Sequence, residues 1–375
     1  MFGKKDKLTS EQVMAALEKV TDPILEKGLI ELGMVKNVAI DTDRVRIEVE
    51  LPTPAWEAQD VLKHEINVAL ELLLDGRTLD MAWGSNVQSS RTQGSDGQNL
   101  VPGARNVILF ASGKGGVGKS TIASNVSAAL AQLGANVGLL DADIYGPSIP
   151  TMFGTKEMPA VGPGGNKLSP VQQHKLKLMS IGFVVDAKDA MTWRGPMLNG
   201  ALIQFMRDVE WGDLDYLCLD LPPGTGDVQL TIAQNVKVSG AILVSTPQDV
   251  ALVDVTRAKA MFDRVGIPIL GVVENMSAFE CSSCGAVHHI FSNGGAERLA
   301  NELELPVLGQ VPIELGVRES GDAGRPEVLS NPNSQASREI YKIAKRVATE
   351  LAKQAIDQAE KAKNQPGGGR LRIVQ

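Results

Sequence analysis

A glycine-rich segment between an apolar run and a helical pattern most strongly limits what this 375-residue chain can fold into. Gly113–Ser120 has the spacing G-x-x-x-x-G-K-S, and Val107–Ala111 precedes it as a candidate buried strand. Such glycines let backbone N–H groups turn inward around phosphate oxygens, and the helix expected at about Lys119–Leu133 points its positive end at the anion. The segment predicts a nucleotide-binding P-loop, with Lys119 at the β- and γ-phosphates and Ser120 on Mg²⁺.

A second lysine stands inside this loop. Lys114 follows the first glycine directly, which resembles the deviant Walker A ATPases, the class that includes MinD, ParA and the nitrogenase iron protein. In that class this lysine reaches across a dimer to the partner's nucleotide. The resemblance therefore implies a homodimer in which Lys114 acts in catalysis.

The composition is that of an ordinary globular protein, with 43% hydrophobic and 22% charged residues. A net charge of −7 argues against a broad nucleic-acid surface. The charged start, Met1–Lys7, does not resemble a signal peptide, and no run of about eighteen apolar residues suggests a membrane span. We therefore expect a cytoplasmic protein that binds neither nucleic acid nor membrane.

Two domains and a linker are expected. Residues 1–88 predict a small α/β domain of order αββαβ, and residues 89–104 have little apolar content, which is typical of a flexible linker. The elements expected in the small domain are a helix at Thr9–Val20, strands at Met34–Ile40 and Arg44–Leu51, a helix at Trp56–Leu74 and a strand at Arg77–Trp83.

Apolar strand patterns alternate with helical ones over residues 105–354, which predicts a three-layer α/β P-loop ATPase with a mainly parallel sheet. The expected strands are Val107–Ala111, Val137–Leu140, Leu178–Val184, Tyr216–Leu219, Ala241–Ser245, Ile269–Val273 and Val307–Val311. A long helix is expected over Ser334–Asn364, and residues 355–375 are predicted to form a helical or mobile tail. The lack of bulky apolar residues after Ile356 disfavours a membrane-targeting role for that helix.

Carboxylates follow two of the expected strands, where ligands of such sheets bind. Asp141 and Asp143 could cap a turn, but beside a P-loop we assign Asp143 to orienting the attacking water and Asp141 to supporting Mg²⁺ or the switch geometry. Asp220 ends a buried strand as a Walker B aspartate does, and Gly224 could offer its N–H to the γ-phosphate. Asn275 either contacts the nucleotide base or is a buried turn residue.

Cys281 and Cys284 form a second chemical centre. Two thiolates are half of a four-ligand site, and Cys218 lies between leucines in an expected strand. Two copies of the chain would supply four cysteines for a shared [4Fe-4S] cluster. Zinc bound with His288 or His289 is the main alternative, and a redox dithiol or a surface disulfide is a weaker one.

The order of these motifs resembles the Mrp-type iron–sulfur cluster carriers over roughly Asn106–Pro332, and the first eighty-odd residues resemble the small domain that often precedes that ATPase. The resemblance implies a homodimer that binds a labile [4Fe-4S] cluster through Cys281 and Cys284, receives it from a donor or scaffold protein and passes it to apo-proteins under control of ATP. The small domain often carries a cysteine where this chain has Pro52–Trp56, which puts a second thiol site there in doubt.

The main hypothesis is therefore a slow ATPase that carries iron–sulfur clusters and uses ATP and Mg²⁺. A ParA- or MinD-like positioning ATPase and a zinc-stabilised nucleotide switch are the alternatives. Lys114, Lys119 and Asp143 are the expected catalytic residues, and Ser120 and Asp220 the expected Mg²⁺ ligands. The residues expected at the nucleotide are Gly113, Lys114, Gly115, Gly116, Val117, Gly118, Lys119, Ser120, Thr121, Asp141, Asp220, Gly224 and Asn275.

Overall fold

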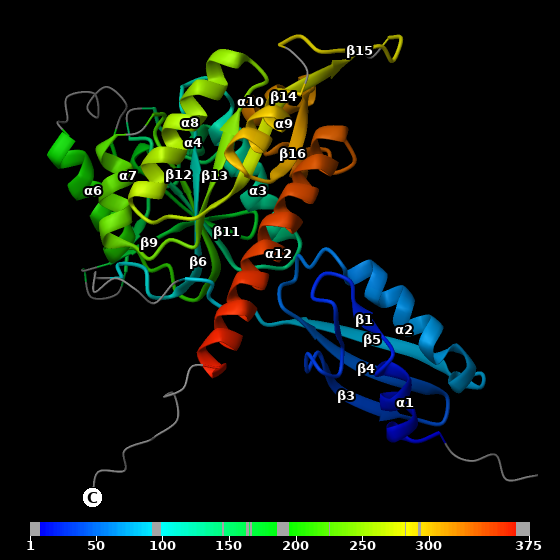
Figure 1. Cartoon of the computed structure of the whole chain (residues 1–375). Coiled ribbons are helices and arrows are strands. Elements are labelled where there is room, and N and C mark those ends of the chain that lie inside the picture. The colour runs from blue at the N-terminus through cyan, green and yellow to red at the C-terminus, as the bar shows by residue number, and fades with distance from the viewer. Residues whose placement is uncertain are drawn as a thin grey trace, which may run out of the picture. The chain divides into compact units, whose positions relative to one another are not determined.

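The computed structural model describes residues 8–91, 99–144, 146–162, 165, 167–185, 195–224, 226–281, 283–291 and 294–364 (Figure 1). The chain divides into two compact units, Met1–Val87 and Gln88–Gln375. The start of the chain, the centre of the expected linker at 92–98 and the tail at 365–375 lie outside the described residues.

The first unit is a small α/β domain in which two helices accompany a three-stranded sheet. Its sheet has the order β3-β4-β5, with β3 antiparallel and β5 parallel to β4. Thr9 caps the first helix through a reciprocal capping box with Gln12, as expected for a helix start. The elements are α1 Ser10–Leu17, β1 Thr21–Asp22, β2 Lys27–Gly28, β3 Val35–Ile40, β4 Arg44–Leu51, α2 Gln59–Leu74 and β5 Thr78–Ser85. The predicted order αββαβ is confirmed, with one additional short ribbon, β1-β2.

The second unit alternates strands and helices along most of its length. Its first half contains β6 Ala104–Ala111, α3 Lys119–Gln132, β7 Val137–Asp141, α4 Ile149–Met152, β8 Ala160–Val161, β9 Leu168–Ser169, β10 Val171–Gln173, β11 Leu176–Ser180, the 3₁₀ turn Ile181–Phe183, α6 Gly195–Asp208 and β12 Leu214–Asp220. Its second half contains α7 Asp227–Asn235, β13 Gly240–Ser245, α8 Asp249–Arg264, β14 Ile269–Glu280, β15 Val287–His288, α9 Gly295–Leu303, β16 Val307–Ile313, α10 Leu315–Asp322, α11 Glu327–Ser330 and α12 Gln335–Asn364.

The described residues of this unit build a nine-stranded sheet. Its order is β10-β11-β7-β12-β6-β13-β14, and β15 and β16 both pair with β14. β11, β7, β12, β6, β13, β14 and β16 are parallel, whereas β10 and β15 join antiparallel at the margins. The predicted mainly parallel sheet is confirmed.

Helices cover both faces of this sheet, which is why its central strands are almost wholly apolar (Figure 1). Alternate residues of β6 pack in one core cluster with residues of α6, α7 and α8, among them Phe205, Ile232 and Phe262. α3 packs against β6, β7 and β12, and α12 packs against α3 and β16. The parallel strands thus end at one edge of a three-layer sandwich, and this edge carries the nucleotide motifs.

Several element limits differ from the predicted ones. The strand expected at Leu178–Val184 stops at Ser180, because Ile181–Phe183 forms a 3₁₀ turn whose entry is capped by the Ser180 hydroxyl. The strand expected at Ile269–Val273 runs on to Glu280, so the motif at Asn275 lies inside β14 and does not close it.

Both described ends of the expected flexible linker are packed against the second unit. Ser90 and Arg91 are buried, and the backbone N–H and hydroxyl of Ser90 donate to Asn106 Oδ1 in β6 at 3.0 and 2.9 Å. Val101 is buried as well, and β6 already begins at Ala104. Hydrogen bonds to β6 therefore hold Ser90, although the polar composition of the segment predicted a flexible linker. No helix in the described part of the chain is long and apolar enough to cross a bilayer.

Candidate functional site

The P-loop joins the end of β6 to the start of α3, and its shape depends on glycine. Gly116 and Gly118 have φ angles of +80° and +81°, a region that costs other residues steric strain. A Cβ placed on Gly113 would stand 2.2 Å from the Cβ of Asp254, so the backbone passes too close to α8 for any side chain. The loop between β6 and α3 therefore needs glycine at positions 113, 116 and 118.

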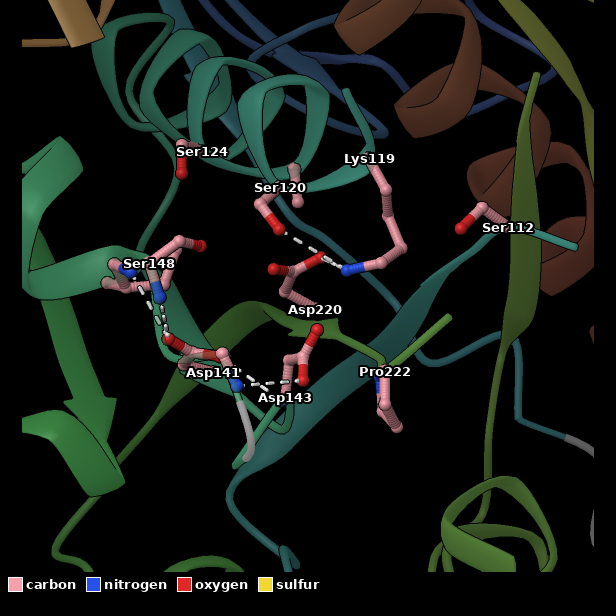
Figure 2. A network of polar contacts seen from close by, with 12 residues as sticks. Ser112, Lys119, Ser120, Ser124, Asp141, Asp143, Ser148, Asp220 and Pro222 are labelled. Atoms are coloured by element: carbon pink, nitrogen blue, oxygen red, sulfur yellow. Dashed lines mark hydrogen bonds and ion pairs between the residues drawn. The ribbon is translucent and has the colours of Figure 1, made fainter. Parts of the chain in front are cut away.

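The centre of the site is a buried ion pair. Lys119 Nζ contacts Asp220 Oδ1, and the two side chains are 6% and 0% exposed (Figure 2). Lys119 Nζ also lies 3.3 Å from the Ser120 hydroxyl. The other carboxylate oxygen, Asp220 Oδ2, is buried and has no hydrogen-bond partner among the described residues. A buried acceptor left unpaired beside a P-loop serine fits Mg²⁺ or one of its water ligands, so Ser120 and Asp220 fit the ion.

Asp141 anchors the loop that follows β7. Its Oδ1 accepts the backbone N–H of Asp143 at 3.1 Å. Its Oδ2 accepts the N–H groups of Ser148 and Ile149 at 3.0 and 3.2 Å, and the Ser180 hydroxyl at 3.1 Å. Because protein donors occupy both of its oxygens, Asp141 fixes the backbone of the loop that follows β7.

Three carboxylates share this edge of the sheet, and their pKa values are all shifted in the same direction. Burial, reinforced by the charge of Asp220, raises the pKa of Asp141 to about 7. Burial raises the pKa of Asp220 as well, although Lys119 opposes that shift. Burial also raises the pKa of Asp143, whose carboxylate faces the space between Lys119 and Asp220 in Figure 2. The cluster gathers carboxylates where Mg²⁺ would bring positive charge.

Asn275 contacts the P-loop from β14, which is two strands away from β6 in the sheet. Its Nδ2 donates to the carbonyl oxygen of Val117 at 2.9 Å, and both residues are buried. A Cβ on Gly118 would stand 2.1 Å from the same Nδ2. The next residue, Met276, has a φ of +59°, an uncommon conformation for a side chain of this kind. β14 therefore contacts the phosphate loop through Asn275 and then bends.

A cavity of about 640 Å³ opens beside this contact. Thr121 and Asn275 line it, together with residues of α4, α10 and the end of β16. Its volume suits a ligand the size of a nucleoside.

The remaining P-loop contacts come from distant parts of the chain. Lys114 Nζ donates to Oε1 of Gln248 at 3.0 Å, and Gln248 stands at the start of α8. Gly224 has a φ of +93°, its N–H donates to the Ser112 carbonyl at 2.9 Å, and its own carbonyl accepts from Gln229 Nε2 at 3.0 Å. The turn after Asp220 is thereby tied to the residue that precedes the P-loop.

The cysteines lie on a hairpin away from the P-loop. β14 and β15 pair as Phe279 with His288 and Glu280 with Val287, and the N–H of Cys281 donates to the carbonyl of Ala286 at 2.9 Å. Cys281 is half-buried and Cys284 is exposed. The backbone N–H of Ser283, then that of Cys284 and the Cys284 thiol, lower the pKa of the Cys281 thiol. Thiolate is the form that ligates metal.

No described group of three or more His, Cys, Asp or Glu side chains is arranged to hold a metal ion. His289 Nδ1 lies 3.3 Å from the carbonyl oxygen of Ser277, and His288 is exposed on β15. In the described parts of one chain, the cysteine pair therefore lacks the histidine partner that the zinc alternative needs. Cys218 is fully buried in β12, and burial raises its pKa to about 12, as suits a core thiol.

Sequence reasoning missed the residues that hold the site in place. Gln248, Ser180 and Asp254 contact functional residues from positions far away in the chain, whereas Gln229 contacts Gly224 from five positions along. Thr246–Ala251 resembles a family segment, which was the available signal for Gln248. The others carry no local signal, because a glutamine or serine on a strand or helix has the same appearance in sequence wherever it points.

Comparisons with known proteins agree with this geometry. A family model described as NUBPL iron-transfer P-loop NTPase matches residues 103–348, and one described as iron-sulfur cluster assembly protein matches residues 10–78. Proteins named iron-sulfur cluster carrier protein from Haemophilus influenzae and Escherichia coli are each 42% identical over 350 residues. The matches cover 92% and 93% of this chain and 94% of each relative.

Solved structures give the same fold. A nucleotide-binding protein from Archaeoglobus fulgidus in complex with ADP is 39% identical, with a TM-score of 0.53, over 60% of this chain and 88% of that one. The cell division ATPase MinD from Pyrococcus furiosus, at 21% identity and a TM-score of 0.51, shares the fold over 64% of this chain and 98% of its own. The chain belongs to the family of NUBPL-type iron-transfer P-loop NTPases.

Proposed function

We propose that this protein is an ATP-dependent carrier of iron–sulfur clusters. It works in the cytoplasm as a homodimer, takes a labile [4Fe-4S] cluster from a donor protein and delivers it to apo-proteins. The names of the relatives from Haemophilus influenzae and Escherichia coli support the carrier role. The cluster is cargo, whereas Mg²⁺ and ATP belong to the switch that governs it.

The cysteine hairpin carries this proposal. Cys281 and Cys284 stand at its tip, accessible and with the thiolate of Cys281 favoured. Two thiolates are half of the four that a [4Fe-4S] cluster takes, one on each iron, and the described part of the chain places no third ligand beside them. A second copy related by a twofold axis supplies the missing pair and leaves the cluster near the surface, where an acceptor protein can reach it.

The P-loop supplies the control. Lys119 binds the β- and γ-phosphates, Ser120 and Asp220 hold Mg²⁺, Asp143 orients the attacking water, and Lys114 acts on the nucleotide of the partner subunit. Bound Mg²⁺ would offset the negative charge that develops on the phosphates. We expect intrinsic turnover of roughly 10⁻⁴ to 10⁻² per second, the range of P-loop enzymes that work without a partner-supplied group.

Anaerobic reconstitution tests the cargo. The full chain is supplied with ferrous iron and sulfide, and iron, sulfide and zinc are measured across a sizing column. About four iron and four sulfide per dimer are expected for a Cys₄-ligated cluster. Cys281→Ser and Cys284→Ser are expected to lose them, while the matched variant His288→Ala/His289→Ala keeps them.

Two other results would defeat the proposal. One zinc per monomer without sulfide, lost with the histidines, would indicate a nucleotide switch with a structural metal. Wild-type protein that binds neither metal but assembles on DNA or lipid with ATP would indicate a positioning ATPase.

A further inference from the structure

Helix α2 of the small domain is apolar on two sides. On one side Leu62, Ile66 and Leu70 are fully buried, and these residues join the helix to its own domain. A helix that needs only this attachment would be polar over the rest of its surface. α2, which lies at the edge of the small domain in Figure 1, carries exposed apolar residues on its other side as well.

A second apolar stripe faces away from the domain. Val61, Val68 and Leu72 are 48%, 55% and 95% exposed. They stand at positions i, i+7 and i+11, which fall within about 40° of one another around a helix of 3.6 residues per turn. The Leu72 side chain therefore contributes almost no packing to the folded domain. Exposed aliphatic residues that share one side of a helix are typical of a docking surface.

Acidic residues border this stripe. Glu65 and Glu71 are exposed, and helical geometry places them about 40° and 80° from its axis, on opposite sides. His64 lies about 60° away, and Glu57 and Asp75 flank the two ends. Lys63, which is the one basic Lys or Arg within α2, lies about 160° away on the far side of the helix. The docking face therefore combines apolar contacts with negative charge.

This charge pattern selects the occupant. A second copy of the chain would bring glutamates against glutamates, which opposes self-association. An anionic lipid surface would be repelled for the same reason. A protein segment with apolar side chains between lysines and arginines is complementary on both counts.

We propose that the α2 face, defined as Val61, Val68 and Leu72 with Glu65 and Glu71, docks the apo-protein that receives the cluster. The acceptor offers an amphipathic segment with a basic border. Docking on the small domain holds the acceptor near the carrier while its own cysteines compete for the cluster. The inference rests on the proposed carrier function and adds a recognition surface to it.

The experiment compares delivery to a protein with delivery to a small molecule. The full-length, cluster-loaded protein is mixed with a [4Fe-4S] dehydratase of the same proteome stripped of its cluster, and recovery of dehydratase activity is followed at limiting acceptor. In parallel, a small iron chelator takes the cluster without docking. The variants are Val68→Ser/Leu72→Ser for the apolar stripe and Glu65→Lys/Glu71→Lys for the border. The matched controls are Met158→Ser/Val161→Ser, with comparable exposure in the other unit, and Lys63→Glu.

Both surface variants are expected to transfer at least fivefold more slowly to the dehydratase and at the wild-type rate to the chelator, with unchanged iron content and melting temperature. The controls are expected to match the wild type in both assays, and raised salt is expected to slow only protein transfer. Equal dehydratase transfer by wild type and variants would overturn the inference. A changed oligomeric state in light scattering would overturn it too, because the stripe would then belong to a dimer contact. Wild-type protein that takes up no cluster would defeat the carrier function itself.

Discussion

The hydrogen bond from Asn275 to the P-loop leads to the sharpest prediction. Asn275→Ala removes the donor that meets the Val117 carbonyl at 2.9 Å in a buried setting. A buried carbonyl left without its partner costs about 1–3 kcal/mol. Phosphate binding requires the loop in its present shape, so the same energy is lost from nucleotide binding. At 1.4 kcal/mol per tenfold, the nucleotide affinity falls by about 5- to 150-fold.

The structure gives Asn275 a positioning role toward the phosphate loop, and this role makes the effect independent of the base. We expect Asn275→Ala to weaken ATP, GTP and inorganic tripolyphosphate by the same factor. Titration of a fluorescent nucleotide, with displacement by each unlabelled ligand, measures all three. Asn235→Ala is the matched control, because that asparagine also donates to a backbone carbonyl, Thr231 at 2.8 Å, but away from the P-loop.

A selective loss would refute this reasoning. If ATP weakened while tripolyphosphate kept its wild-type affinity, Asn275 would act on the base and the Val117 bond would be incidental. A drop in melting temperature without any change in nucleotide affinity would assign the bond to stability alone.

Three further predictions follow from the same site. Gly113→Ala should abolish nucleotide binding in the same titration, because its Cβ would meet another Cβ at 2.2 Å, whereas Gly115→Ala should retain it, since the nearest atom is 3.9 Å away. Lys119→Met should lower the urea-unfolding free energy of the nucleotide-free protein by about 3–5 kcal/mol, because it leaves the buried Asp220 unpaired. Adding Asp220→Asn should restore most of the loss, and a double variant without recovery would contradict the ion-pair argument. Burial raises the pKa of Asp143, so turnover should fall as pH drops through a midpoint above the ordinary aspartate value of about 4, and Asp143→Asn should remove this acid limb from the kcat profile.

The sequence predicted the fold well because its signals are local. Glycines with the P-loop spacing, apolar strands and the aspartates that end β7 and β12 can be recognised from neighbouring residues alone. The features that the sequence did not predict, such as the full length of β14, depend on contacts between residues far apart in the chain. The continuation of β14 past Asn275 requires Met276 at a positive φ and an irregular register with β16, and neither has a sequence signature.

The candidate site divides in the same way. Lys119 and Asp220 form an ion pair although they are 101 positions apart, because adjacent parallel strands bring their ends to one edge. The contact of Lys114 with Gln248 and the burial of Ser90 depend on side-chain directions that only the assembled unit determines. From composition alone, the residues around Ser90 were expected to form a flexible linker.

β14 carries Asn275 against the phosphate loop and, six positions later, delivers the chain to Cys281. Six residues of strand extend at most about 20 Å. The two chemical centres are therefore separated by a fixed count of residues. A single inserted or deleted residue between them would turn the strand over and aim the thiols at the opposite face, whereas the exchange of one side chain would not. For the relation between the two centres, the number of residues in this segment therefore matters more than the identity of each side chain.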